Sequence, residues 1–225
     1  MLLLAIDTSG RHGSVALCRG DANSFEILQL TALEGGTYSA RLIPTIDEIL
    51  QPHHLAMADL DGFAIVSGPG SFTGLRVGLA TVKGLCEVLH KPLVTISMLA
   101  AIALTHGTGG GKVSAILDAG RGEAYVGDYE VTAGGAKLIR EYITKLGQFE
   151  GAAEHGRELL TPDAPGADFF RQAGKQARLV TPVQADGIGR IGLRKLLAGE
   201  VADHAIIDVN YIRRSDAEIF SAPKH

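Results

Sequence analysis

The chain has 225 residues and a formal net charge of −4, and its composition, 46% hydrophobic and 20% charged, is ordinary for a globular protein. The negative charge argues against a protein that binds nucleic acid without a partner protein, because displacing counterions from phosphates usually needs a basic face. The two cysteines, Cys18 and Cys86, have no Cys-x-x-Cys spacing, so neither a disulfide framework nor a thiolate metal site is expected.

The N-terminal stretch over residues 2–6 is predicted to be a buried strand. Its apolar run stops at Asp7 and no basic leader precedes it, so it is too short for a signal peptide or a membrane span. We therefore expect a cytoplasmic protein that begins with this strand and does not associate with a membrane.

The first half of the chain predicts three strands and then an alternation of helices and strands. Strands over residues 2–6, 14–18 and 25–30, separated by short Gly-rich turns, should form an antiparallel meander. An amphipathic helix over 39–51 follows, then a strand from Phe63, a Gly-rich turn, a helix to His90 and a strand over 92–97. This order is typical of a ribonuclease-H-like domain.

The second half begins in the same way. A strand over 113–117 ends at Asp118, as the first strand ends at Asp7, and strands over 123–129 and 137–143 follow. After Lys145 the signals weaken, with helices expected at 167–177 and 187–198 and a last segment at 209–214. A duplicated α/β fold is the economical interpretation. We expect ribonuclease-H-like domains at 1–105 and 106–225, the second copy degenerate, with packing of the last helix on the first domain as one option.

The helix over residues 73–90 is apolar over most of its circumference, which is wider than the roughly 100° stripe that packing on one sheet requires. Its narrow polar sector consists of Arg76, Lys83, Glu87 and His90. Gly74, Gly78 and Gly84 each cost about 1 kcal/mol relative to Ala and let another backbone come close. The helix is therefore either wholly internal or packed between the sheet and a partner.

The Gly-rich turn over residues 67–74 also leaves two interpretations open. Such a turn presents backbone N–H groups at a helix N-terminus and can hold an anion. However, it lacks both the Gly-Lys-Ser/Thr ending of a P-loop and the Gly-x-Gly-x-x-Gly spacing of a dinucleotide fingerprint. The alternative is a structural turn in which Ser71 or Thr73 caps the helix.

Motifs spread over nearly the whole chain occur in one characteristic order. They are Ile-Asp-Thr-Ser at 6–9, Ser-Val-Ala-Leu at 14–17, the continuous run at 67–85, Leu-Asp-Ala-Gly-Arg-Gly-Glu-Ala-Tyr at 117–125, and Tyr-Ile-Arg-Arg at 211–214 before Ala217 and Glu218. Together they resemble the bacterial TsaB family, also called YeaZ. The long motif at 67–85 is highly specific for it.

The resemblance implies an actin-like, sugar-kinase-like (ASKHA) fold and a role in making N6-threonylcarbamoyladenosine at position 37 of tRNAs that read ANN codons. In this family the protein is the non-catalytic partner of TsaD, which transfers the threonylcarbamoyl group, and the ATPase TsaE docks on the pair. The resemblance implies no cofactor in this chain, with ATP and a metal ion in the partner subunits. It also implies tRNA binding only through the complex, and a homodimer when TsaD is absent.

The resemblance further implies that the helices over 39–51 and 73–90 form the subunit contact. Candidate partner-facing residues on them are Leu42, Ile46, Ile49, Leu75, Gly78, Leu79 and Val82. A charge at Gly78 is expected to abolish TsaD binding while leaving a folded monomer. Asp7, Ser9 and Asp118 are expected to be vestigial phosphate or turn positions.

The chain departs from the family pattern at two places. Family members usually carry His-Ser where this chain has Tyr38 and Ser39, and Asp-Ala-Arg where it has Asp118, Ala119 and Gly120. Neither departure removes catalysis, because none is expected of this subunit. The change at Tyr38 concerns the start of the first interface helix.

An active kinase or ATPase of the same superfamily is one alternative function. Asp7 and Asp118 follow first strands, where such enzymes use a carboxylate to hold Mg²⁺ and orient phosphates. They are equally well explained as turn residues that accept N–H groups of the following hairpin. No clear Gly-rich adenosine-binding loop follows Lys145.

A metallopeptidase-like protein is a less favoured alternative. Zinc sites often use a His pair one helical turn apart, but the eight histidines include no His-x-x-x-His and no His-Glu-x-x-His. His53 and His54 are adjacent and would diverge by about 100° on a helix. The Gly-x-Ser-x-Gly elbow of serine hydrolases is also absent.

Overall fold

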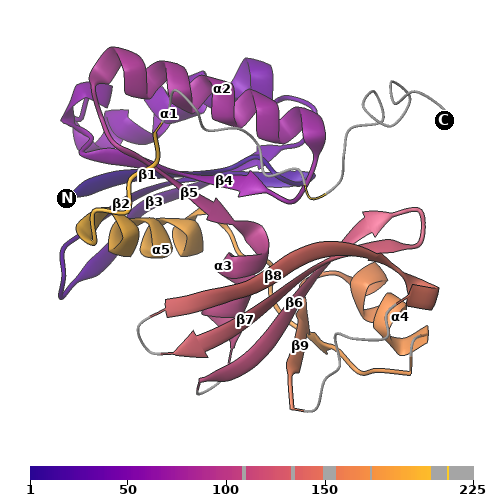
Figure 1. Cartoon of the computed structure of the whole chain (residues 1–225). Helices are drawn as coiled ribbons and strands as arrows, with labels where there is room; N and C mark the ends of the chain where they lie inside the picture. Colours follow the sequence, from indigo (N-terminus) through magenta and orange to yellow (C-terminus); the bar gives the residue numbers. More distant parts are fainter. Residues whose placement is uncertain (108–109, 133–134, 149–155, 173, 204–211, 213–225) are drawn as a thin grey trace, which may run out of the picture. The chain divides into compact units, whose positions relative to one another are not determined.

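The computed structural model describes residues 1–107, 110–132, 135–148, 156–172, 174–203 and 212, which form two compact units (Figure 1). Unit 1 contains Met1–Ala101 and the segment that starts at Pro182, and unit 2 contains Ile102–Thr181. The segment predicted at 209–214, including Arg213 and Arg214, lies outside the described residues except for Ile212.

Unit 1 is built on a five-stranded sheet in the order β3-β2-β1-β4-β5. Its strands are β1 (Leu2–Asp7), β2 (His12–Gly20), β3 (Phe25–Glu34), β4 (Gly62–Gly68) and β5 (Leu93–Ser97). The first three strands pair antiparallel, and β1, β4 and β5 pair parallel. Every residue of β1 and β4 is buried, as expected for central strands that are covered on both faces.

Helices cover both faces of this sheet (Figure 1). On one face lie α1 (Tyr38–Leu50) and α2 (Phe72–Leu89), close to the predicted helices, and on the other lies α5 (Ala185–Leu197). The short 3-10 turns η1 (Gln51–His53) and η2 (Met57–Asp59) connect α1 to β4. The apolar helix α3 (Met98–His106), which the sequence analysis did not predict, spans the boundary between the two units.

The helix α5 belongs to unit 1. The sequence analysis numbered it within the domain at 106–225 and gave its packing on the first domain as one option. The side-chain oxygen Oγ of Ser14 on β2 accepts the N–H of Ala185 at 2.9 Å, which satisfies one free donor of the first turn of α5. Gly192 has no side chain, and a methyl group there would lie 2.5 Å from Cβ of Ala64 on β4. The helix therefore packs very close to the first sheet.

Unit 2 repeats the topology of unit 1, with the strand order β10-β9-β6-β7-β8. Its strands are β6 (Gly111–Gly120), β7 (Glu123–Thr132), β8 (Gly135–Lys145), β9 (Glu158–Thr161) and β10 (Arg178–Leu179). The strands β8, β7 and β6 pair antiparallel, and β6, β9 and β10 pair parallel. The α/β class and the two ribonuclease-H-like copies predicted from the sequence are confirmed.

The second copy is the smaller one, as predicted. The helix α4 (Ala164–Gln172) lies between β9 and β10, as α2 lies between β4 and β5, but it has 9 residues against 18. The helix was predicted to end at residue 177, but it ends at Gln172. Gly174, which has a φ of 70°, lies shortly after that end. Phe169 and Phe170 of α4 pack with Ile116 and Val126 of the sheet and form a core. The 3-10 turn η3 (Leu146–Gln148) follows β8.

Opposite charges align the outer hairpin of unit 2. Three acidic residues of β7 stand opposite three basic residues of β8: Glu123 opposite Lys145, Asp128 opposite Arg140, and Glu130 opposite Lys137. Cross-strand pairs of this kind stabilise a sheet, whereas like charges directly opposite destabilise it. A one-residue slip would end all three pairings, so the charges favour the observed register.

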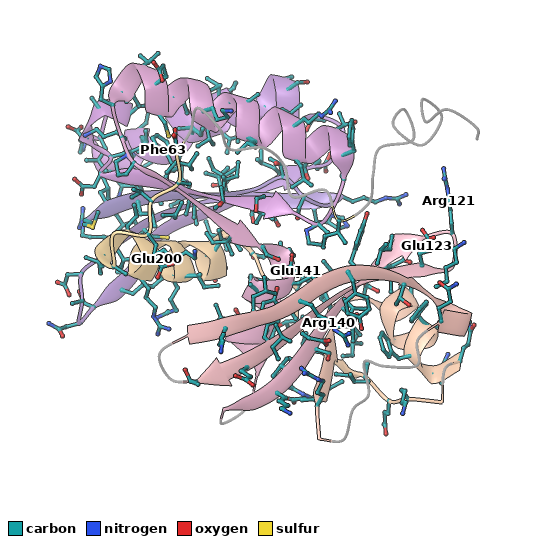
Figure 2. All side chains as sticks on the ribbon, viewed as in Figure 1. Phe63, Arg121, Glu123, Arg140, Glu141 and Glu200 are labelled. Carbon is teal, nitrogen blue, oxygen red and sulfur yellow. The ribbon has the colours of Figure 1, made fainter. Side chains whose placement is uncertain are left out.

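The central pair of this hairpin belongs to a buried network. Asp128 is fully buried, and its carboxylate accepts the Nε–H of Arg140 at 2.7 Å and the hydroxyl of Ser114 at 2.6 Å. The guanidinium of Arg157, whose side chain is only 7% exposed, lies 3.9 Å away. Figure 2 labels Arg140 on β8. Asp128 is thus the carboxylate that compensates the charge of Arg157.

We expect Asp128→Ala to lower the free energy of unfolding by about 3–5 kcal/mol, because it leaves a buried guanidinium without its carboxylate. Urea denaturation followed by circular dichroism measures this change. The control is Asp168→Ala, which removes an exposed pair with Arg171 and should cost no more than about 1 kcal/mol. Equal losses for the two variants would contradict the role given to the network.

Candidate functional site

Two turns of unit 1 meet at the carboxyl ends of the neighbouring parallel strands β1 and β4. They are the β1–β2 turn, residues 8–11, and the β4–α2 turn, residues 69–71. In open α/β sheets ligands bind at this edge. The predicted positions Asp7 and Ser9 and the Gly-rich motif all lie here, so the pair of turns is the first candidate site.

The carboxylate of Asp7 is directed to its own turn. Its Oδ1 accepts the backbone N–H of Ser9 at 2.8 Å and the Ser9 hydroxyl at 2.6 Å. Burial raises the pKa of Asp7, and the two hydrogen bonds from Ser9 counteract part of this effect. Asp7 therefore has the contacts expected of a turn residue.

The space between the two turns is occupied by the protein itself. The backbone N–H of Ser71 donates to the carbonyl of Ser9 at 2.6 Å. A methyl group at Gly70 would overlap the carbonyl of Ser9, and one at Gly74 would overlap the carbonyl of Thr8. Ser71 also caps α2, since its Oγ accepts the N–H of Gly74 at 3.3 Å. These contacts and the Ser71 cap are the ones that the structural-turn interpretation expects.

The corresponding turn of unit 2 contains Asp118, which is exposed. Its Oδ1 accepts the N–H of Gly120 at 2.9 Å, again as a turn residue does. Its own N–H donates to Oδ2 of Asp163 at 3.2 Å. Figure 2 labels Arg121 in the turn after β6 and Glu123 at the start of β7.

Asp163 is a residue that the sequence analysis missed. It directly precedes α4, and its carboxylate accepts the N–H of Gly166, as an N-cap residue does. Burial raises the pKa of Asp163. The N–H groups of Gly166 and Asp118 that bind its carboxylate counteract part of this effect, and the negative charge of Asp118 adds a smaller upward contribution. An Asp two residues before Pro165 was the available signal, because Pro favours the first turn of a helix.

Among the residues that the structure describes, no three His, Cys, Asp or Glu side chains gather so that they could hold a metal ion. None of the helices there is long and apolar enough to cross a membrane.

The seven candidate partner-facing residues on α1 and α2 do not face solvent. Leu42, Ile46, Ile49, Leu75, Gly78, Leu79 and Val82 are all buried within unit 1. Large apolar side chains at helical spacing form the stripe that packs on the sheet, so this choice of face is corrected. The expectation for Gly78 is corrected too, because a methyl group there would overlap the hydroxyl of Thr8.

The opposite faces of the two helices carry small and apolar residues beside exposed charged ones, such as Arg41 and Glu48 of α1 and Arg76 and Glu87 of α2. We define the outer face as Ala40, Ile43 and Pro44 of α1 with Val77, Ala80, Gly84 and Val88 of α2. Val88 is 77% exposed and Ile43 is 44% exposed. A methyl group at Gly84 would meet no atom within 4 Å. The helices pack on the sheet with one side and present the outer face with the other.

Comparison with known proteins agrees with this architecture. The profile of the TsaD family, described as tRNA N6-adenosine threonylcarbamoyltransferase, matches residues 36–181. A crystal structure of an uncharacterised Pseudomonas aeruginosa protein similar to the peptidase YeaZ superposes with a TM-score of 0.76 at 25% identity, covering 94% of this chain and 99% of that one.

Two relatives are named tRNA threonylcarbamoyladenosine biosynthesis protein TsaB. The Bacillus subtilis (strain 168) protein is 35% identical over 60% of this chain and 57% of its own length. The Haemophilus influenzae (strain ATCC 51907 / DSM 11121 / KW20 / Rd) protein is 40% identical over 46% of this chain and 42% of its own length. The matched part thus spans about half the length of these curated relatives.

Two copies of the ribonuclease-H-like topology define an actin-like, sugar-kinase-like protein. The chain belongs to the TsaD family. Within that family it is similar to the TsaB proteins of Bacillus subtilis and Haemophilus influenzae and to the YeaZ-like protein of Pseudomonas aeruginosa.

We expect opposite effects from one substitution at two glycines of α2. Gly78→Ala should lower the free energy of unfolding by about 1–3 kcal/mol, because the added methyl group overlaps the buried hydroxyl of Thr8. Gly84→Ala should raise it by up to about 1 kcal/mol, since Ala favours a helix and the site is open. Urea denaturation of the two variants measures both, and a loss at Gly84 would contradict an open outer face.

The raised pKa of Asp7 predicts a pH effect. The folded chain retains a proton that the unfolded chain releases, so the free energy of unfolding should fall as pH rises from the ordinary carboxyl pKa through the raised one. Asp7→Asn keeps an acceptor for Ser9 and should remove this decline.

Unfolding at a series of pH values measures the effect. The matched control is Asp21→Asn, because hydrogen bonds from Asn23 and Ser24 lower the pKa of Asp21. A lowered pKa stabilises the fold above the ordinary carboxyl pKa and loses this effect on acidification, so the control should change the pH profile in the opposite sense. A profile unaltered by Asp7→Asn would disprove the prediction.

Proposed function

We propose that this chain is a non-catalytic scaffold subunit of the complex that transfers a threonylcarbamoyl group to N6 of adenosine 37 in tRNAs that read ANN codons. The family match and the two relatives named for threonylcarbamoyladenosine biosynthesis support the pathway. The observation that carries the non-catalytic role is the hydrogen bond from Ser71 to Ser9, which joins the two turns where a superfamily enzyme would hold phosphate.

The proposed partner is TsaD, bound through the outer face of α1 and α2. A stable interface usually takes about 800 Å² from each subunit, and two neighbouring helices offer a continuous surface for it. The small residues Ala80 and Gly84 let a partner helix approach closely, and Ile43 and Val88 supply exposed apolar contacts. When TsaD is absent, the same surface would support a homodimer.

The remaining components of the proposal follow from the same role. The chain would carry no cofactor, and ATP and a metal ion would belong to TsaD and to the ATPase TsaE, which docks on the pair. With a net charge of −4, the chain would meet tRNA only through the complex. The proposed location is the cytoplasm, where tRNA is modified.

Reconstitution of tRNA modification with purified subunits tests this function. Product should form with the complete set of subunits, disappear when this chain is omitted, and be absent with this chain alone. ATP turnover is measured in parallel on the isolated chain. Product formation without the chain, or robust ATP turnover by the chain alone, would overturn the proposal.

We expect Gly84→Arg to weaken TsaD binding at least about tenfold, because a charge would be buried at the centre of the contact without a partner. The site is open, so the isolated chain should stay folded. The control is Leu197→Arg on α5, which puts the same charge at a 45% exposed position on the opposite face of the sheet. Calorimetric titration gives both affinities, and equal affinities would rule out the outer face as the docking surface.

A further inference from the structure

The side chain of Tyr38 connects the first turn of α1 to the β1–β2 turn. Tyr38 is the first residue of α1 and is only 5% exposed. Thr37, which precedes it, makes no side-chain hydrogen bond to cap the helix. The Tyr38 hydroxyl instead donates to the carbonyl of Gly10 at 2.6 Å. The start of α1 is therefore attached to the sheet by a side chain and not by a cap.

Two glycines leave room for the Tyr38 ring. A methyl group at Gly13, at the start of β2, would lie 2.7 Å from the hydroxyl oxygen and 2.8 Å from Cε1. A methyl group at Gly74, in the first turn of α2, would lie 3.2 Å from Cε2. The ring thus lies against β2 through Gly13 and against α2 through Gly74.

The side chain of Tyr38, on α1, consequently reaches three other parts of unit 1. Its hydroxyl binds the β1–β2 turn, and its ring lies beside Gly13 on β2 and beside the first turn of α2. A Tyr side chain has few rotatable bonds and packs as a rigid plate, so it can set a distance between the elements that it touches. The β1–β2 turn, whose Ser9 carbonyl also binds Ser71, links both helix starts.

We propose that Tyr38 is a positioning residue that sets the start of α1 relative to the start of α2, and thereby the shape of the outer face. The inference rests on the proposed function for its consequence, because the outer face is the proposed docking surface for TsaD. It assigns a role to a position at which this chain departs from the pattern of its family.

The test is Tyr38→Phe, which keeps the ring and removes only the hydroxyl. We expect affinity for TsaD to fall about fivefold, as for loss of one buried hydrogen bond that orders a binding surface. Backbone amides in the first turns of α1 and α2 should exchange hydrogen faster in the isolated chain. Tyr38→Leu, which also removes the ring edge beside Gly74, should weaken binding further.

The control is Ser14→Ala, which removes a different hydroxyl hydrogen bond, the one to Ala185 on the other face of the same sheet. It should lower unfolding stability comparably and leave TsaD affinity unchanged. Wild-type affinity in Tyr38→Phe, or an equal loss in Ser14→Ala, would overturn the positioning role.

The two proposals can fail separately. If the wild-type chain does not bind TsaD at all, the proposed function fails. Hydrogen exchange then decides the positioning role alone: faster exchange confined to the first turns of α1 and α2 in Tyr38→Phe supports it, and unchanged exchange overturns it.

Discussion

The contact between the β1–β2 turn and the β4–α2 turn governs the rest of unit 1. The Ser71 N–H binds the Ser9 carbonyl, and Gly70 and Gly74 allow the two backbones to approach without side chains between them. This approach lies at the edge of the sheet at which open α/β proteins bind ligands. It also determines where α2 begins, and through Tyr38 it reaches the start of α1. The two turns thus hold the starts of both helices.

The two sides of α2 differ in the size of their residues. Leu75, Leu79 and Val82 fill the space above the sheet, whereas Ala80 and Gly84 on the outer face leave space for another backbone. Each glycine in a helix costs about 1 kcal/mol of stability relative to Ala. At Gly78 the close packing that the glycine permits compensates for this cost, whereas at Gly84 nothing in the isolated chain does so. The uncompensated glycine is the physical argument for a partner on the outer face.

Unit 2 keeps the topology of unit 1, but its strands β9 and β10 and its helix α4 are shorter than β4, β5 and α2. Its outer hairpin is aligned by opposite charges, and its buried Asp128 joins β6, β7 and β8 through Ser114 and Arg140. Buried ionic networks favour one arrangement over others more than they add stability. With α4 only half as long as α2, the network and the small aromatic core together define the register of the second sheet.

The sequence by itself determined the class of the fold, its duplication, most of the longer strands and helices, and the family, because hydrophobic periodicity, turn residues and motifs are local properties. It did not predict β9 and β10, since strands of four and two residues are too short to show a period. Tertiary structure alone decided which face of α1 and α2 packs on the sheet. Gly78 and Gly84 are the same residue type in the same helix, but Gly78 lies against Thr8 and Gly84 lies in open space. The tertiary structure likewise decided that α5 returns to unit 1, where the N–H of Ala185 binds the hydroxyl of Ser14, 171 residues earlier in the chain. Contacts between residues so far apart leave no periodic signal in the sequence.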